Sequence, residues 1–295
     1  MENRTSVALG FFDGVHAAHQ KIINAAVTAA EKRGLRPVAL SFDTPPALTL
    51  FGSCPPLLTD NEEKGRLITA LGAECILLPT TRELLSMSGE EFVRSVLAQK
   101  LGASYAVCGF NYHFGRDRLD ANDLIELGRK YGIETEILPE ERLNGYPVSS
   151  SRVRELLSKG DMEQAAWLLG RPYRIRGTVA EGKHLGRTMG FPTINIYPDL
   201  QPIIPRGVYA AKVIFDGQEH IGVTNVGINP TVGDTGMSVE THIPDFTGNL
   251  YGITVEVRLF SFIRPEQRFL SVDELFAQIG RDTNSVTKYF ANKLI

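Results

Sequence analysis

The strongest constraint on the fold is a regular alternation of short apolar runs and helical segments over the first 140 residues. Runs of four to eight apolar residues bounded by turn signals are typical of buried strands. Four such runs are present: Val7–Phe11, Pro37–Phe42, Cys75–Leu78 and Tyr105–Cys108. Glu134–Leu138, after the last predicted helix, reads as a fifth strand. Strands that alternate with helices in this way favour a parallel sheet covered by helices on both faces.

The segments between these runs carry helix signals. Ala17–Lys32 reads as a helix ended by Gly34, and Asp120–Tyr131 reads as another. A Ser or Thr followed three residues later by Glu forms a capping box at a helix start. Thr59 with Glu62 predicts a helix to Leu71, and Ser88 with Glu91 predicts a helix to Lys100.

Polar clusters follow the predicted strands at their carboxyl ends. These clusters are Gly10–His19, Ser41–Pro46, Gly109–Arg118 and Ser149–Arg154. Open α/β sheets bind ligands in the crevice outside the carboxyl ends of their strands. We therefore expect a ligand site at this edge, although the pattern alone names no reaction.

His16 and His19 narrow the chemistry of that edge. They lie three residues apart at a predicted helix start, so their rings share a face. A helix N-terminus attracts phosphate, and two imidazoles would strengthen that attraction. The alternative is one capping histidine and one surface histidine. No set of Cys, His and carboxylate residues with zinc-like spacing accompanies them, which disfavours a metal site.

The second half of the chain predicts a different architecture. Six short runs are separated by Gly, Pro, Asn and Asp: Tyr173–Val179, Thr193–Tyr197, Val208–Phe215, His220–Val226, Ser238–Ile243 and Thr254–Phe262. Six short strands with turn residues between them favour a closed antiparallel barrel. Asp216-Gly217 is a hairpin signal, and Ser271 with Glu274 caps a last helix. The linker Gly170–Pro172 divides the chain into domains 1–170 and 171–295.

Gly182–Ile196 combines spaced glycines with a strand. Gly182, Gly186 and Gly190 allow close approach of the backbone to a phosphate. Thr193 and Asn195 share one strand face and offer oxygen ligands suited to Mg²⁺. Spacing alone equally fits a glycine-rich turn before an ordinary strand. Glu240 is a candidate general base on a half-buried strand, and the alternative is a solvated carboxylate.

Composition argues against several classes of protein, namely nucleic-acid-binding, membrane-spanning and secreted proteins. The chain has 295 residues and a net charge of −3. Residues 1–170 hold 18 basic and 22 acidic residues, and residues 171–295 hold 13 and 12, so nucleic acid is not an expected partner. Three cysteines without a C-x-x-C pair indicate reduced thiols in a cytoplasmic protein. The apolar run at the N-terminus is too short for a membrane span or signal peptide. The oligomeric state is open, and a homo-oligomer is allowed.

The stretch from Gly177 to Asn195 reads G-T-V-x-x-G-x-x-x-G-R-x-x-G-F-P-T-x-N and resembles the signature of riboflavin kinases. The resemblance implies that Glu240 is the catalytic base and that Thr193 and Asn195 bind Mg²⁺ and the ATP phosphates. The same resemblance implies flavin contacts from Arg264 and Glu266. The residues it implies for closing over ATP are Gly182, Lys183, Gly186 and Gly190.

Gly10–His19 resembles the G-x-F-D-G-x-H-x-G-H signature of adenylyltransferases of the nucleotidylyl-transferase superfamily. Val148–Arg154 and Gly109–Gly115 resemble further motifs of FMN adenylyltransferases. The resemblance implies that His16 and His19 stabilise charge at the ATP α-phosphate. It also implies ATP contacts from Gly10, Phe12, Asp13, Ser149, Ser150 and Arg154, and flavin contacts from Asn111 and Phe114.

The two resemblances, in this order, are those of the bifunctional riboflavin kinase/FMN adenylyltransferase family. They imply a Rossmann-like parallel domain, a barrel domain with a C-terminal helix, and riboflavin, FMN, FAD and ATP as substrates and products. Two departures stand out: the family's H-x-G-H glycine is Ala18, and a usual histidine motif is replaced by Thr44-Pro45-Pro46. They leave open an alternative, a riboflavin kinase with an impaired or regulatory first domain.

Overall fold

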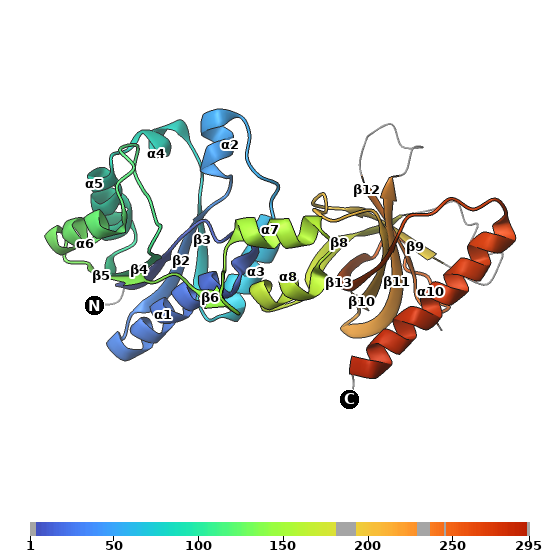
Figure 1. Ribbon diagram of the computed structural model, residues 1–295. Coiled ribbons are helices and arrows are strands. Elements are labelled where there is room, and N and C mark those ends of the chain that lie inside the picture. Colours follow the sequence, from blue (N-terminus) through green and yellow to red (C-terminus); the bar gives the residue numbers. More distant parts are fainter. Residues whose placement is uncertain (1–3, 181–192, 229–236, 245, 294–295) are drawn as a thin grey trace. The chain divides into compact units, whose positions relative to one another are not determined.

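The computed structural model describes residues 4–180, 193–228, 237–244 and 246–293, drawn in Figure 1. The chain divides into two compact units, Met1–Ser150 and Ser151–Ile295, and each is described by itself. None of the helices in the described part of the chain combines the length and the apolar character needed to span a bilayer.

The first unit is built on a five-stranded parallel sheet in the order β3-β2-β1-β4-β5. Its strands are β1 (Thr5–Leu9), β2 (Arg36–Phe42), β3 (Glu74–Leu78), β4 (Ala103–Gly109) and β5 (Glu134–Leu138). All five predicted strands are confirmed. The order reverses at β1, because the chain runs outward from β1 through β2 to β3 and then returns to β4 on the other side.

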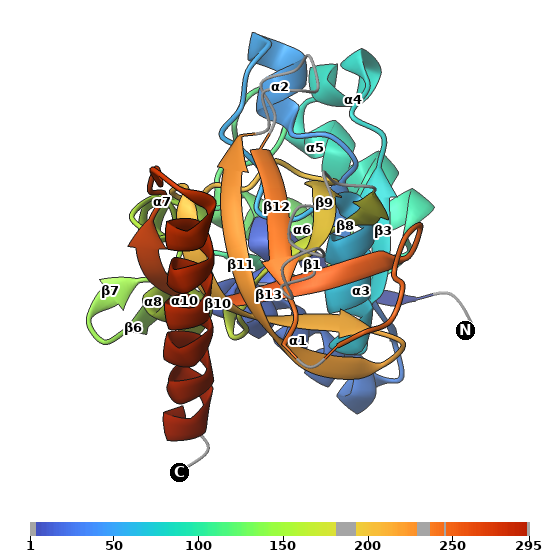
Figure 2. The ribbon, with the colours of Figure 1, turned by 90° about the vertical axis from the view of Figure 1, so that its right-hand side faces the viewer.

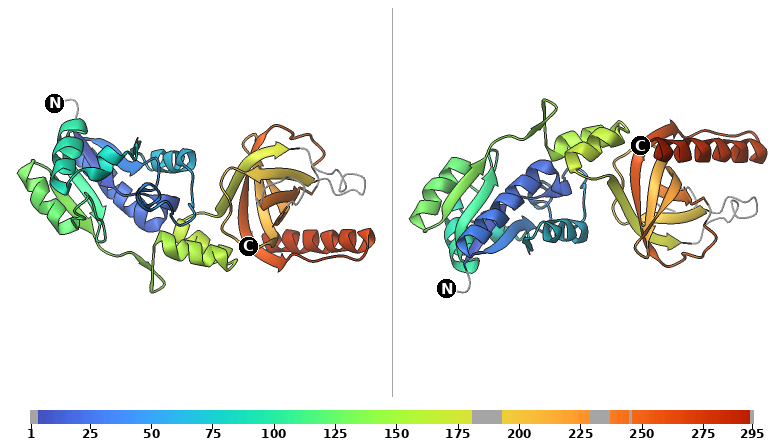
Figure 3. Two further views of the ribbon diagram at one scale, coloured as in Figure 1. Left: turned by 90° about the horizontal axis from the view of Figure 1, so that it is seen from above. Right: turned by 90° about the horizontal axis from the view of Figure 1, so that it is seen from below.

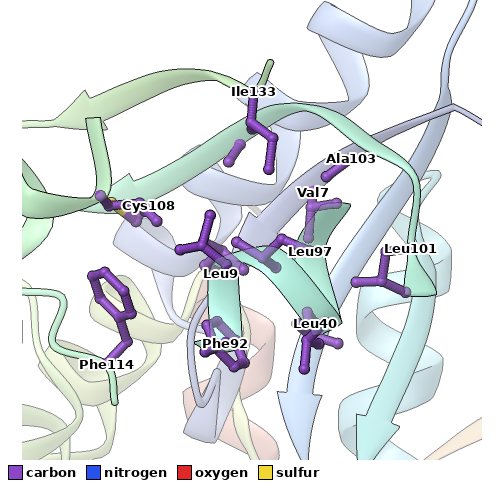
Figure 4. Close-up of a cluster of buried hydrophobic side chains, with 14 of the residues drawn as sticks. Val7, Leu9, Leu40, Phe92, Leu97, Leu101, Ala103, Cys108, Phe114 and Ile133 are labelled. Atoms are coloured by element: carbon purple, nitrogen blue, oxygen red, sulfur yellow. The ribbon is translucent and has the colours of Figure 1, made fainter. Parts of the chain in front are cut away.

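Helices cover both faces of this sheet. Helices α1 (Ala17–Arg33) and α3 (Asn61–Ala70) pack on one face, and η2 (Phe92–Lys100) and α6 (Ala121–Lys130) on the other. Successive strand residues point to opposite faces, so Ala8 joins the first layer while Val7 and Leu9 join the second. Figure 4 shows the second layer, where Leu9 and Leu40 meet Phe92 and Leu97.

One predicted cap is wrong. Asp60, not Thr59, is the N-cap of α3, and its carboxylate accepts a hydrogen bond from the backbone N–H of Glu63. The Thr59 hydroxyl instead accepts from the backbone N–H of Gly14, at 3.1 Å. The Ser88 cap is confirmed by a bond from the backbone N–H of Glu91, although this helix continues into the π-helical η2.

Smaller elements complete the first unit. They are η1 (Asp13–Val15), α2 (Pro46–Phe51), α4 (Arg82–Ser86), α5 (Gly89–Glu91), β6 (Arg142–Leu143) and β7 (Tyr146–Pro147). Helix η1 follows β1 and α2 follows β2, so both lie at the carboxyl edge of the sheet.

The second unit begins within α7 (Ser150–Ser158), is followed by α8 (Met162–Leu169) and continues into a closed barrel. The barrel order is β10-β11-β12-β9-β8-β13, with every neighbouring pair antiparallel. The strands are β8 (Tyr173–Ala180), β9 (Thr193–Pro198), β10 (Gly207–Phe215), β11 (Gln218–Ile228), β12 (Met237–His242) and β13 (Thr254–Pro265). The six predicted strands and the Asp216-Gly217 hairpin, with φ of 48° and 73°, are confirmed.

The barrel interior is filled by side chains. Thr224 and Thr241 share a buried hydrogen bond of 2.9 Å there, beside the fully buried ring of Tyr209. The opposite strand face, which carries Val208 and Val223, packs against α10 (Val272–Lys293). Figures 2 and 3 show α10 running along the outside of the barrel.

Candidate active sites

The turn after β1 is strained. Phe12 and Val15 have φ values of 54° and 42°, a left-handed conformation that non-glycine residues rarely adopt, and Gly14 between them has φ of 80°. Such residues cost about 1–3 kcal/mol each and persist only where surrounding contacts hold them. Strain of this kind clusters at functional sites, and here it lies at the carboxyl edge where the sequence predicts a ligand.

Several hydrogen bonds fix the turn. The Asp13 carboxylate accepts from the backbone N–H groups of Leu58 and Thr59, at 2.9 and 3.3 Å. The Ser150 hydroxyl donates to the Asp13 carbonyl at 3.0 Å, and the Ser41 hydroxyl donates to the Phe11 carbonyl at 2.7 Å. Asp13 thus anchors the turn through its side chain.

The structure brings His16 and His19 together. Their rings stack with centroids 3.5 Å apart and planes 18° from parallel. His16 is also the N-cap of α1, because its Nδ1 accepts from the backbone N–H of His19 at 3.4 Å. In a neutral His16 that accepts this bond, the ring proton lies on Nε2. His16 is therefore a cap, as the alternative held, and His19 is its half-buried, stacked partner.

His19 is held in its neutral form. Burial is the largest cause that lowers its pKa well below 6.5, followed by the nearby charges of His16 and Lys64. Its Nδ1 is buried without a hydrogen-bond partner among the described residues. A neutral, poorly solvated imidazole at a helix N-terminus is prepared to gain hydrogen bonds, or a proton, when an anion arrives.

Other predicted residues of this edge have different surroundings. Phe12 is 0% exposed and packs edge-on to His19, so only its backbone can face a nucleotide. Phe114 is 7% exposed and stacks on Tyr112 in the core. Asn111 lies in the loop after β4, where its backbone carbonyl accepts a hydrogen bond from Nδ1 of His113. Arg154 lies on α7, which groups with the second unit.

The two departures from the family signature fit the structure without strain. Ala18 lies in the first turn of α1 and is not among the residues with positive φ, so its backbone does not require glycine. Pro46 is the first residue of α2, a position that proline favours. Asp43, two residues before Pro45, accepts from the backbone N–H and the hydroxyl of Thr80.

Lys64 is a residue of this region that the sequence reasoning missed. It lies on α3 and is 1% exposed, with its Nζ 4.1 Å from the centroid of the Phe11 ring. One signal could have revealed it: Lys64 precedes the core residue Ile68 by four positions, so it lies on the apolar face of the helix.

In the barrel, strand register places the predicted catalytic residues side by side. Glu240 of β12 pairs directly with Asn195 of β9, and the neighbouring pair is His242 with Thr193. On its other side Glu240 pairs with Asn225 of β11, which the sequence analysis did not single out. Directly paired residues share a face, so Asn225, Glu240 and Asn195 form a polar row on the outer surface of the barrel.

Arg264 and Glu266 flank this face differently. The Gly227 Cα faces Glu266 so closely that an added Cβ would lie 2.5 Å from its Oε1, which places Glu266 beside Asn225 and the polar row. Arg264 donates from Nε and Nη2 to Asp282 of α10, at 2.7–3.1 Å, and from Nη1 to the Pro265 carbonyl. Arg264 therefore fastens α10 to the barrel, and its donors are already engaged.

The predicted ATP-binding residues Gly182, Lys183, Gly186 and Gly190 lie outside the described residues. The described part of the chain contains no group of three or more His, Cys, Asp or Glu side chains that could hold a metal ion by themselves. The hydroxyl of Thr193 and the carboxamide of Asn195 still suit Mg²⁺, which takes few protein ligands and completes its shell with water and phosphates.

Comparisons with known proteins agree with this geometry. A family model described as FAD synthetase matches residues 1–152, and one described as riboflavin kinase matches residues 169–290. A bifunctional riboflavin kinase/FMN adenylyltransferase from Listeria monocytogenes is 34% identical, covering 97% of this chain and 92% of the relative. The proteins of that name from Bacillus subtilis and Escherichia coli are also 34% identical, covering 98% and 96% of this chain and 93% and 92% of the relatives.

A solved structure from Streptococcus pneumoniae, described as a macrolide-efflux protein, has a TM-score of 0.90 and 31% identity, covering 97% of this chain and 95% of its own. The two folds and the two polar sites define a two-domain, ATP-dependent transferase of flavin-cofactor synthesis. More particularly, the chain belongs to the bifunctional riboflavin kinase/FMN adenylyltransferase family.

Proposed function

We propose that this protein phosphorylates riboflavin to FMN and then adenylylates FMN to FAD, with ATP as co-substrate in both steps. We assign the adenylyl transfer to residues 1–170 and the kinase to residues 171–295, and we expect both to occur in the cytoplasm. The observation that carries the proposal is the register of β9 with β12, which sets Glu240 opposite Asn195 on one outer face.

In the kinase reaction the 5′-hydroxyl of riboflavin attacks the γ-phosphorus of ATP, and ADP leaves. Glu240 accepts the hydroxyl proton, for which it must lie within hydrogen-bond reach of that oxygen. Asn195 and Thr193 would hold Mg²⁺ against the phosphates, and the ion would neutralise charge on the transferred group. Gly182, Lys183, Gly186 and Gly190 would cover the phosphates, and Glu266 would contact the flavin side.

In the adenylyl transfer a phosphate oxygen of FMN attacks the α-phosphorus of ATP, and pyrophosphate leaves. Positioning and charge neutralisation supply most of the catalysis in such a transfer. His16, through Nε2–H, and His19 would stabilise charge on the α-phosphate at the N-terminus of α1. Gly10 and the turn to Asp13 would follow the nucleotide backbone, and Ser149, Ser150 and Arg154 would hold the pyrophosphate.

The flavin of this second step would lie against the loop that begins after β4. Asn111 supplies a polar contact, and the buried ring of Phe114 fixes the shape of the loop beneath it. Arg264 acts on the kinase flavin site indirectly, because its ion pair with Asp282 sets the position of α10.

Product analysis tests the proposal. Purified protein is incubated with riboflavin, ATP and Mg²⁺, and the flavins are separated over time. We expect FMN first and FAD later. Accumulation of FMN without FAD would refute the assignment of the first domain, and absence of both would refute the whole proposal.

A Glu240→Gln variant tests the base. Because the amide cannot accept the hydroxyl proton, FMN formation should fall by about 10²–10⁴-fold, the usual contribution of a general base. FAD formation from added FMN should stay unchanged in the same protein. Wild-type kinase activity in this variant would remove Glu240 from the mechanism.

A further inference from the structure

Lys64 is a buried cation that neither proposed reaction uses. Its ammonium is 3.3 Å from the carbonyl oxygen of Phe42, 3.5 Å from the Ser41 hydroxyl and 4.1 Å from the centroid of the Phe11 ring. Among the described residues these partners are uncharged, and both hydrogen bonds are long. Lysine is almost never fully buried unless it is paired.

The position of Lys64 connects two segments of the carboxyl edge. Phe11 belongs to the strained turn after β1, whereas Ser41 and Phe42 end β2. Ser41 also donates to the Phe11 carbonyl, so one ammonium and one hydroxyl together fasten the turn to β2. The turn leads into His16, the N-cap of α1, and into His19 in the first turn of α1, so Lys64 contacts the segment that positions both histidines.

We propose that Lys64 is a positioning residue for the adenylyl transfer, in which its buried ammonium holds the turn against β2 and supplies a fixed positive charge beneath the phosphate site. This inference rests on the proposed adenylyl transfer. An anion bound at the turn would be attracted to the Lys64 ammonium, because opposite charges in a poorly solvated site attract each other more strongly than in water. The chemistry that fits is the triphosphate of the nucleotide.

The charges around His19 support this role. His16 stacks on it and Lys64 acts from α3, and both lower its pKa. Lys64 is itself faced by Asp13 of the turn, Asp43 after β2 and Cys75 of β3, while burial lowers its own pKa. Lys64 thus helps to keep His19 neutral in the free protein, and an arriving phosphate reverses the balance.

A merely structural lysine and a positioning lysine predict different results. The partners of Lys64 at hydrogen-bond distance are uncharged, and Asp13 and Asp43 act on it electrostatically. The Asp13 carboxylate keeps its hydrogen bonds from the backbone N–H groups of Leu58 and Thr59 when Lys64 is replaced. Lys64→Met should therefore keep a melting temperature close to that of wild type and yet make FAD more slowly.

The experiment compares Lys64→Met, which removes charge and donor, with Lys64→Gln, which removes the charge and keeps a donor. Lys32→Met on α1 is the matched control, because it removes an exposed lysine from the same unit. FAD formation from FMN and riboflavin phosphorylation are measured for each protein. We expect the first to fall at least tenfold in both Lys64 variants, mainly through kcat, and the second to stay within twofold.

The direct readout is the titration of His19 by NMR, assigned with a His19→Gln variant. Loss of the nearby positive charge should raise the His19 pKa in both Lys64 variants and leave it unchanged in Lys32→Met. An unmoved His19 pKa, or FAD formation within twofold of wild type, would overturn the inference. A parallel loss of both activities with a lower melting temperature would also overturn it, in favour of a structural role. If wild type itself makes no FAD, the proposed function fails, while the His19 titration still decides the electrostatic claim.

Discussion

The ion pair between Arg264 and Asp282 allows a quantitative prediction about the stability of the second unit. Asp282 is 4% exposed and accepts from the Nε and Nη2 atoms of Arg264 and from Nε2 of Gln278, at 2.7–3.1 Å. Asp282→Ala removes the carboxylate and leaves a guanidinium in a largely buried position. We expect the attachment of α10 to β13 to be weakened, while the apolar packing of Val286 against the barrel stays intact.

The magnitude follows from the burial. Removing one partner of a buried ion pair costs about 3–5 kcal/mol, because the other charge is left uncompensated. The Arg264 side chain keeps 15% of its surface exposed, so water can solvate it in part and the lower end applies. A loss of about 3 kcal/mol corresponds to a factor of about 150 in the folding equilibrium of this unit.

Chemical denaturation of the full chain, followed by a probe in the second unit, measures the loss. Riboflavin phosphorylation should fall near the shifted transition, whereas FAD formation from added FMN serves as the internal control. The double variant Arg264→Met/Asp282→Leu should recover most of the stability, since it leaves no charge behind. A single variant within 1 kcal/mol of wild type, or a double variant less stable than the single, would refute the reasoning.

Three further predictions concern local features. Because the pKa of His19 lies below its unfolded value, the unfolded chain binds more protons, and stability is lost as pH falls from about 6.5 through the folded pKa; denaturation from pH 7.5 to 5 should show a shallower loss in His19→Gln. Ala18→Gly should cost about 1 kcal/mol in α1 and bring no gain in FAD formation, and a gain would show that the Ala18 methyl obstructs the nucleotide. Gly217→Ala, at φ of 73° in the β10–β11 hairpin, should cost about 1 kcal/mol by thermal denaturation, because alanine is strained in the left-handed conformation; an unchanged melting temperature would contradict that strain.

Much of the fold could be predicted because its signals are local. Apolar runs of strand length and turn residues such as Asp216-Gly217 determine the conformation of their own short segments. The structure confirms the strands and the hairpin that they predict. The cap at Thr59 was wrong because two cap-competent residues are adjacent, and a tertiary bond from Gly14 engages the Thr59 hydroxyl. No periodicity in the sequence carries that information.

The candidate sites show the same limit. Alternation along β12 predicted that Glu240 and His242 share one face of the strand. Only the pairing with β9 and β11 places Glu240 between Asn195 and Asn225. Arg264 looked available because its partner lies eighteen residues further along the chain, on another element. Lys64 was not predicted because a lysine on a polar helix is ordinarily solvated, and its contacts with Phe11, Ser41 and Phe42 come from distant parts of the sequence.

His16 both caps α1 and carries the proposed catalytic imidazole, so few substitutions can test its catalytic role alone. The residue begins α1 through its Nδ1, so an alanine there removes a helix start together with any catalytic imidazole. An uncapped α1 would loosen the neighbouring ring of His19, and the two losses could not be told apart. Asparagine, serine and aspartate can each begin a helix. A comparison of wild type with the asparagine and serine variants would therefore measure the loss of the imidazole with the cap retained. The same residues are those that could replace His16 in natural variants without loss of the helix cap.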